Sequence, residues 1–223
     1  MKLAKLEKRA KTKRAKPYNR CMTRIGIYAG TFDPVHAGHI AFALQSAQAA
    51  RLDKVVFLPE RRPRNKQHVE HFGHRVAMLR RASAPYPQFD VLELVDVSFS
   101  VERTLPQLQR LFKGSELVFL FGSDILPRLQ DWPKADRLLA SSELVIGLRH
   151  QDDRQKLRGI IEAWPTPPKM LTMFDSYAPD VSSGRVRQAL ARRRPAKGLL
   201  TSVERYSNRH WLYVSLGQPV DRP

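Results

Sequence analysis

The sequence predicts an α/β fold: a Rossmann-like, doubly wound parallel sheet in a single domain, with a basic N-terminal tail and a C-terminal helical segment. Two observations lead to this prediction. Short apolar runs of strand length alternate with amphipathic segments of helix length, which is the order expected of a parallel sheet with crossover helices. In addition, 223 residues with 42% hydrophobic content suit one domain of this class and allow a sizeable core.

Each predicted strand is an apolar run bounded by a turn signal. The run 116–121 is the most apolar, so we expect it to be the most strongly buried strand. The run 89–94 alternates between apolar and polar residues, which predicts a strand with one face in water. The predicted strands are 25–29, 54–58, 89–94, 116–121, 143–148 and 169–174.

The helices are predicted from apolar side chains at helical spacing. Ser100 is a favourable N-cap for the third helix, and Ser182 and Ser183 stand as caps before a later one. In the second helix, we expect Arg75 to point mostly outward. The predicted helices are 36–50, 69–83, 101–113, 134–139, 149–162, 184–193 and 199–212.

The net charge of +18 is concentrated near the N-terminus, where residues 1–24 hold ten Lys or Arg and one acid, Glu7. The tail is either a disordered basic arm able to touch RNA or acidic partners, or a segment outside the working protein, with Met22 as the start. The second reading is slightly favoured, and a transit peptide is disfavoured because lysine dominates and serine is absent. The chain then divides into an extension (1–22), a main domain (23–216) and a tail (217–223).

Cys21 is the only cysteine, so the chain cannot form an internal disulfide or a cluster of thiolate metal ligands. This fits a reducing cytoplasm. No apolar run approaches the ~20 residues that a membrane span requires, and the N-terminus lacks the apolar core of a secretory signal. We expect a cytoplasmic protein without membrane association, and without a nucleic-acid partner except through the basic tail.

The residues that point to chemistry begin directly after the first predicted strand. Gly30 allows the backbone to bend, and Asp33-Pro34 marks a turn. A helix then starts near His36, which places His36 and His39 on the same side of its first turn. A helix start offers unpaired N–H groups and a partial positive charge, so this stretch predicts a site for the oxygens of a nucleoside triphosphate.

Two other polar segments follow predicted strands. Residues 59–68 form a basic loop broken by proline, and Gly122-Ser123-Asp124 follows the most apolar strand. In an open parallel sheet, ligands bind at the carboxyl ends of the strands. Both segments therefore predict ligand contacts, although on composition alone a solvated charged loop is an equal alternative for the first.

The segment 30–39, GTFDPVHAGH, resembles the HxGH signature of the nucleotidyltransferase superfamily. Other segments occur in the order seen in the bacterial nicotinate-mononucleotide adenylyltransferase family, and the resemblance covers nearly all of 24–213. These segments are the loop 59–66, the helix around 76–79, the stretch 98–105, the turn 122–124 with Trp132, and the segment 181–187.

The resemblance implies adenylyl transfer from ATP to nicotinate mononucleotide, giving deamido-NAD and pyrophosphate in NAD biosynthesis. The 5′-phosphate of the mononucleotide attacks the α-phosphorus in line. Since a phosphate monoester has a second pKa near ~6, this nucleophile is already ionised at neutral pH and needs no general base. The protein's task is to bring two anions together and to stabilise charge on the transferring and leaving oxygens. Mg²⁺ would be carried by ATP oxygens and waters, without protein ligands.

The resemblance also implies residue roles. The implied catalytic residues are His36, His39 and Arg187. The implied ATP-binding residues are Gly30, Thr31, Phe32, Gly38, Asp124, Ser182 and Ser183. The implied acceptor-binding residues are Lys66, Ser100 and Trp132. Simpler readings stay open for some of them: Asp124 as a helix N-cap, Trp132 as core packing and Arg187 as a surface residue.

The sequence departs from the family pattern at three places: Asn65 replaces a histidine, Phe99-Ser100 replaces Tyr-Thr, and Gly184 replaces a threonine. The first two lie where the acceptor is expected, which leaves a different acceptor open, such as nicotinamide mononucleotide or phosphopantetheine, or the chemistry of a cytidylyltransferase. A non-catalytic basic RNA-binding relative of the same fold is the alternative from another class.

Overall fold

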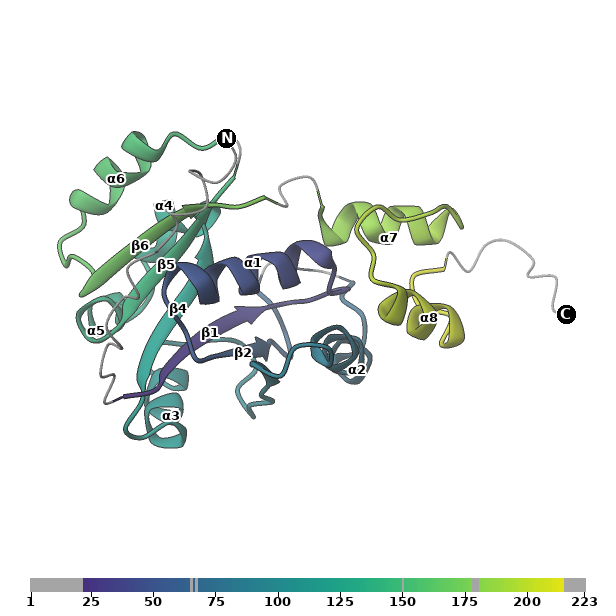
Figure 1. The fold of residues 1–223 in the computed structure, drawn as a ribbon, viewed down its shortest axis with the longest axis horizontal. Helices are drawn as coiled ribbons and strands as arrows, with labels where there is room; N and C mark the ends of the chain where they lie inside the picture. The colour runs from purple at the N-terminus through teal and green to yellow at the C-terminus, as the bar shows by residue number, and fades with distance from the viewer. Residues whose placement is uncertain (1–21, 65, 67, 150, 178–180, 215–223) are drawn as a thin grey trace, which may run out of the picture.

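The computed structural model describes residues 22–64, 66, 68–149, 151–177 and 181–214. Six parallel strands form one sheet in the order β3-β2-β1-β4-β5-β6 (Figure 1). The strands are β1 (Arg24–Gly30), β2 (Lys54–Pro59), β3 (Phe89–Val91), β4 (Glu116–Gly122), β5 (Glu143–Leu148) and β6 (Met170–Asp175). All six predicted strands are present, and the predicted doubly wound sheet is confirmed.

Helices cover both faces of this sheet. They are α1 (Ala37–Ala49), α2 (Phe72–Ser83), α3 (Thr104–Leu111), α4 (Leu126–Leu129), α5 (Ala135–Ser141), α6 (Arg154–Glu162), α7 (Ser183–Ala191) and α8 (Thr201–Arg209), with a short 3₁₀ turn η1 (Ser123–Ile125). One hydrophobic core contains side chains from α3, α4, α5 and α6, and a second contains side chains from α1, α2 and α8. Side chains alternate along each strand and so reach both cores.

The strand order reverses direction between β1 and β4. The chain builds β2 and β3 on one side of β1, and then returns to build β4, β5 and β6 on the other. In sheets of this kind, the crevice at the carboxyl ends of the strands flanking such a reversal is the usual ligand site. Figure 1 shows α7 and α8 beyond the carboxyl end of β1, on the side where this crevice opens.

Several predicted boundaries were wrong; for example, the helix predicted over 149–162 begins at Arg154 and the one predicted over 69–83 begins at Phe72. The third helix begins at Thr104 and not after Ser100, because the Thr104 hydroxyl accepts the Ser100 N–H (3.0 Å) and donates to Asp96 (2.9 Å). The third strand ends at Val91 because it is an edge strand with β2 as its single neighbour. Glu93 already pairs with Arg80 of α2 (2.6 Å).

The predicted outward position of Arg75 was also wrong. This side chain is 1% exposed, and its guanidinium donates hydrogen bonds to main-chain carbonyls. Helical periodicity alone predicts that a charged residue at this position faces water. In the structure, the carbonyls of nearby loops point toward this helix, so the guanidinium is buried with hydrogen-bond partners.

The predicted basic extension (except Met22), Asn65 and the predicted tail lie outside the described residues. Within the described part of the chain, no helix is both long and apolar enough to cross a membrane.

Candidate active site

A cavity of about 870 Å³ opens at the carboxyl edge of the sheet, between the loops that follow β1, β2, β4 and β5 and the first turn of α7. It brings together most of the predicted site residues. Those that line it are His36, His39, Arg187, Thr31, Phe32, Gly38, Asp124, Ser182, Ser183, Lys66 and Trp132. Gly30 and Ser100 do not line it. The two imidazoles and the distant guanidinium therefore share one cavity, as predicted.

The loop after β1 is held by the buried ring of Phe32. Phe32 has a φ of 50°, in the left-handed region that non-glycine residues rarely adopt, and its side chain is 2% exposed. Its ring packs edge-on against Tyr28 (5.3 Å between centroids) and His39 (5.1 Å). A Cβ on Gly30 would approach this ring to 3.0 Å, so Gly30 makes room for Phe32.

The two histidines form one unit at the start of α1. The main-chain N–H of His36 donates to Nδ1 of His39 (3.2 Å), and the two rings lie 3.8 Å apart between centroids. Because Nδ1 accepts this bond, a neutral His39 carries its proton on Nε2, which leaves one N–H donor for a ligand. The Nδ1 atom of His36 is buried without a hydrogen-bond partner among the described residues. The His36 residue lines the cavity, so its imidazole is a candidate ligand contact.

Both imidazoles are neutral in the ligand-free protein. Burial lowers the pKa of His36 from 6.5 to about 4. Burial, followed by the nearby His36 and Lys66, lowers the pKa of His39 well below its ordinary value. At neutral pH the histidines thus meet a ligand as hydrogen-bond donors and not as fixed cations.

We expect the ligand-free protein to lose stability as the pH falls from about 6.5 to about 4. In this window the unfolded chain binds a proton at His36 and the folded protein does not, so acid favours unfolding. The shift of the His36 pKa to about 4 corresponds to about 3 kcal/mol of unfolding free energy. Urea denaturation across this pH range measures the slope. His36→Gln should reduce the slope but leave the contribution of His39, whose pKa is also lowered, and an unchanged slope in that variant would contradict the prediction.

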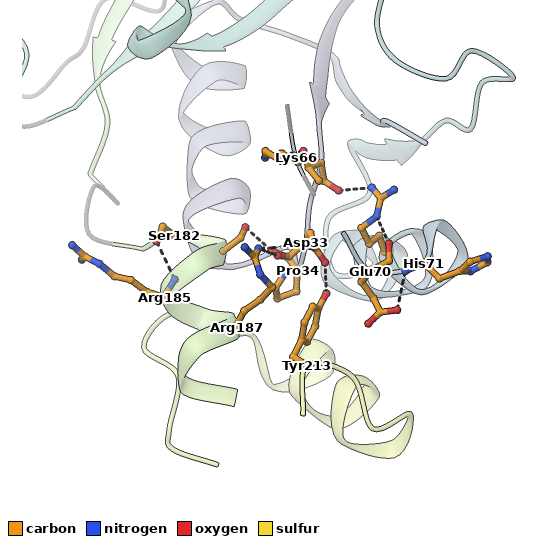
Figure 2. Close-up of polar contacts among 12 residues, drawn as sticks. Asp33, Pro34, Lys66, Glu70, His71, Ser182, Arg185, Arg187 and Tyr213 are labelled. Carbon is orange, nitrogen blue, oxygen red and sulfur yellow. Dashed lines mark hydrogen bonds and ion pairs between the residues drawn. The ribbon is translucent and has the colours of Figure 1, made fainter. Parts of the chain in front are cut away.

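Arg187 reaches the cavity from α7 and is held by the loop after β1. Its guanidinium donates to the main-chain oxygen of Asp33 (2.6 Å) and lies 3.6 Å from the Asp33 carboxylate. The hydroxyl of Tyr213 donates to the same carboxylate (2.7 Å), and Figure 2 shows Arg187 and Tyr213 both pointing toward Asp33. Burial, with the Asp33 charge, raises the pKa of Tyr213, so the phenol remains a donor. Arg187 keeps 40% of its side chain exposed, which leaves guanidinium surface for a ligand.

The start of α7 is docked on the same loop. Ser182 is the N-cap, as predicted: its hydroxyl accepts the Arg185 N–H (3.3 Å). The Ser183 hydroxyl donates to the main-chain oxygen of Pro34 (3.0 Å). A Cβ on Gly184 would meet no atom within 4 Å, so the position where the family pattern has threonine faces open space.

The described residues at the start of the basic loop after β2 contact the segment 92–99. Arg61 donates to the main-chain oxygen of Leu94 (2.9 Å), and the Glu60 carboxylate accepts the Phe99 N–H (3.1 Å). Lys66 donates to the hydroxyl of Thr31 (2.9 Å). The loop after β2 therefore reaches the loop that precedes the HxGH motif, which a free solvated loop would not do.

The remaining predicted residues differ in their surroundings. Trp132 lines the cavity and also packs against Phe99 and Phe121, with centroids 5.9 Å apart in each case. Asp124 is not an N-cap, because Gly122 holds that position in η1. Its carboxylate instead pairs with Arg149 (3.2 Å) across the cavity wall.

Several cavity residues were missed from the sequence: Tyr28, Asp33, Glu60 and Arg149 as lining residues, and Tyr213 as a partner of Asp33. Arg149 follows β5 at its carboxyl end, and the rule that selected Asp124 could have found it. Tyr213 carries no local signal, because its contact with Asp33 spans 180 positions of the chain.

Known proteins resemble this chain over most of its length. The family model described as cytidylyltransferase-like matches residues 27–189. A probable nicotinate-nucleotide adenylyltransferase of Neisseria gonorrhoeae (strain NCCP11945) is 30% identical, and the match covers 86% of this chain and 99% of that protein. A protein of the same name from Roseiflexus sp. (strain RS-1) is 34% identical, with coverage of 85% and 97%.

A solved structure has the same fold. The nicotinic acid mononucleotide adenylyltransferase of Plasmodium falciparum, in a complex with NaAD, superposes with a TM-score of 0.72 at 17% identity, covering 86% of this chain and 97% of that one. A second structure of the Plasmodium falciparum enzyme, in a complex with APC, gives a TM-score of 0.70 at 16% identity.

Proposed function

The chain belongs to the cytidylyltransferase-like family and, within it, to the nicotinate-nucleotide adenylyltransferases, and from this membership we propose that it joins ATP to nicotinate mononucleotide. The products are deamido-NAD and pyrophosphate, in NAD biosynthesis. The observation that carries the proposal is the meeting of His36, His39 and Arg187 in one cavity beside the start of α1.

The reaction exchanges one P–O bond for another. An oxygen of the mononucleotide 5′-phosphate attacks the α-phosphorus of ATP, the bond from that phosphorus to the β-bridging oxygen breaks, and pyrophosphate leaves with the electron pair. Since the nucleophile is already an anion, catalysis consists of alignment and charge stabilisation. A cavity lined by hydrogen-bond donors suits this chemistry, which requires no general base.

We assign the triphosphate to the helix start and α7. The Nε2–H of His39 and the imidazole of His36 would contact phosphate oxygens, where negative charge grows in the transition state. Arg187 would bind the β- and γ-phosphates from the other side, as guanidinium suits phosphate. Gly38 and the Ser182–Ser183 turn allow close approach of main-chain N–H groups.

We assign the mononucleotide to the β2 and β4 side of the cavity. Lys66 is the cation placed to meet its phosphate, next to Thr31. Trp132 offers a ring on which the pyridine could stack. The Asp124–Arg149 pair would bind the ribose hydroxyls or the adenosine of ATP. Ser100 does not line the cavity, so its assignment to the acceptor is withdrawn.

Mg²⁺ fits this site as an ion bound through ATP. Among the described residues, no group of three or more His, Cys, Asp or Glu is arranged to hold a metal. Magnesium commonly binds nucleotide phosphates and keeps several of its waters. When bound in this way, it would supply charge neutralisation on the phosphate oxygens, and the protein residues would orient those oxygens.

Pyrophosphate release with separate acceptors tests the proposal. The protein is incubated with ATP and Mg²⁺, together with nicotinate mononucleotide, nicotinamide mononucleotide or phosphopantetheine in parallel, and CTP with glycerol 3-phosphate forms a further arm. We expect the highest kcat/KM with nicotinate mononucleotide, and deamido-NAD identified by mass. Faster turnover with another acceptor would replace the acceptor assignment, and no pyrophosphate in any arm would overturn the function.

A further inference from the structure

Arg75 is a buried cation bound by main-chain oxygens. Its side chain, on α2, is 1% exposed. The guanidinium donates to the carbonyl oxygens of Thr31 (2.6 Å), Glu60 (2.8 Å), Arg61 (3.1 Å) and Glu70 (2.9 Å). A guanidinium has five N–H donors in one rigid plane, so it can serve several carbonyls at once, as a lysine ammonium cannot.

The carbonyls of Thr31, Glu60 and Arg61 belong to the two loops that would bind the two substrates. Thr31 lies in the loop after β1, five residues before His36. Glu60 and Arg61 lie in the loop after β2, which carries Lys66. The Thr31 hydroxyl accepts a hydrogen bond from Lys66 (2.9 Å), and its carbonyl accepts one from Arg75, so two different segments bind this residue. Arg75 thus joins the ATP-side loop to the acceptor-side loop.

The surroundings of Arg75 hold it in one orientation. The ring of Phe72 lies 5.4 Å from its guanidinium carbon and 4.3 Å from that of Arg61. Figure 2 shows Glu70 and His71 on the opposite side of Asp33 from Arg187. The loop after β1 is therefore held at two points: Arg187 binds the carbonyl of Asp33, and Arg75 binds the carbonyl of Thr31, two residues earlier.

We propose that Arg75 is a positioning residue for adenylyl transfer, which sets the distance and angle between the two bound phosphates by fixing the loops after β1 and β2 relative to each other. Arg75 does not line the cavity, so it would touch neither substrate. Its effect would be on alignment, where a shift of about 1 Å can cost about a hundredfold in rate. This inference rests on the proposed function.

Arg75→Lys tests the proposal because it keeps the charge but cannot reach all four carbonyls. We expect kcat to fall about 30-fold, while the Kd of a non-hydrolysable ATP analogue and that of nicotinate mononucleotide, each measured alone by calorimetry, change less than about threefold. Each substrate retains its own contacts, so only the reaction of the two together suffers. Rates are expressed per folded molecule, from the binding stoichiometry, at a temperature well below the melting midpoint.

Arg80→Lys is the matched control, since Arg80 is on the same helix, is 61% exposed and pairs with Glu93. It should retain wild-type kcat. A second measurement uses Arg75→Ala with millimolar methylguanidinium, which should restore part of kcat, whereas equal sodium chloride should not. If Arg75→Ala does not fold, Arg75→Lys alone carries the test.

Three results would overturn the inference. Equal kcat values for Arg75→Lys and Arg80→Lys would show that the bonds to both loops are dispensable. A lowered melting temperature with unchanged kcat per folded molecule would assign Arg75 to stability alone. A wild-type protein inactive with every acceptor would overturn the proposed function and this inference with it, so the two failures are distinguishable.

Discussion

His39→Ala should lower kcat for adenylyl transfer at least about a hundredfold, because the change removes an N–H donor at the site where charge grows in the transition state. The Nδ1 atom of His39 is occupied by the His36 N–H, which leaves Nε2–H for the phosphate. Ground-state binding of ATP should change less, since Arg187 and the helix start remain. Steady-state kinetics with ATP and nicotinate mononucleotide give kcat and both KM values.

Two further variants make this prediction specific. His39→Gln keeps an N–H donor at about the reach of Nε2 and should lose less activity than His39→Ala. His210, which is exposed and does not line the cavity, provides the matched histidine control, and His210→Ala should keep wild-type kcat. Near-normal turnover in a folded His39→Ala protein would count against the assignment of the histidines.

Arg187→Ala should reduce kcat/KM for ATP about a hundredfold, through both a higher KM for ATP and a lower kcat. The change removes a cation assigned to the β- and γ-phosphates. It also deprives the buried Asp33 carboxylate of its cation, so some loss of stability accompanies it. The KM for nicotinate mononucleotide should change little, because the acceptor is assigned to the other side of the cavity. Initial rates at varied ATP and fixed acceptor measure the effect.

Arg185→Ala is the control on the same helix. Arg185 is exposed and does not line the cavity, and Figure 2 shows its side chain directed away from Asp33. It should keep the wild-type KM for ATP. Arg187→Lys should recover only part of the loss, since an ammonium cannot bind Asp33 and a phosphate in the geometry of a guanidinium. An unchanged KM for ATP in Arg187→Ala would remove Arg187 from the ATP site.

The sequence predicted the sheet because its strands are mostly buried and therefore mostly apolar, as in β5, where all six residues are buried and Glu143 is the one charged residue. Predictions failed where a tertiary contact decides a boundary. Serine is a residue type that favours the N-cap position, so Ser100 was predicted to be one. The hydroxyl of Thr104 instead accepts the Ser100 N–H, and the helix starts later. The third strand is shorter than its alternation suggests because it has one neighbour only.

The site was predictable to the extent that its residues form local motifs. His36 and His39 are three residues apart on one helix start, so the sequence alone places them together. The convergence of Arg187 on them rested on family resemblance, and the cavity agrees with it. The contacts of Arg75 and Tyr213 had no local signal, because each binds an oxygen brought near by the whole fold.

Because the strand order reverses between β1 and β4, the residues assigned to the site come from two consecutive halves of the chain. The segment before Gly114 carries both histidines, Lys66 and Arg75, whereas the segment after it carries Trp132 and Arg187. Gly114 has a φ of +82° and follows α3, on a turn where a Cβ would meet no atom within 4 Å. A protein split there would yield two inactive fragments, and recovered turnover on mixing them would report that the two halves of the sheet had paired.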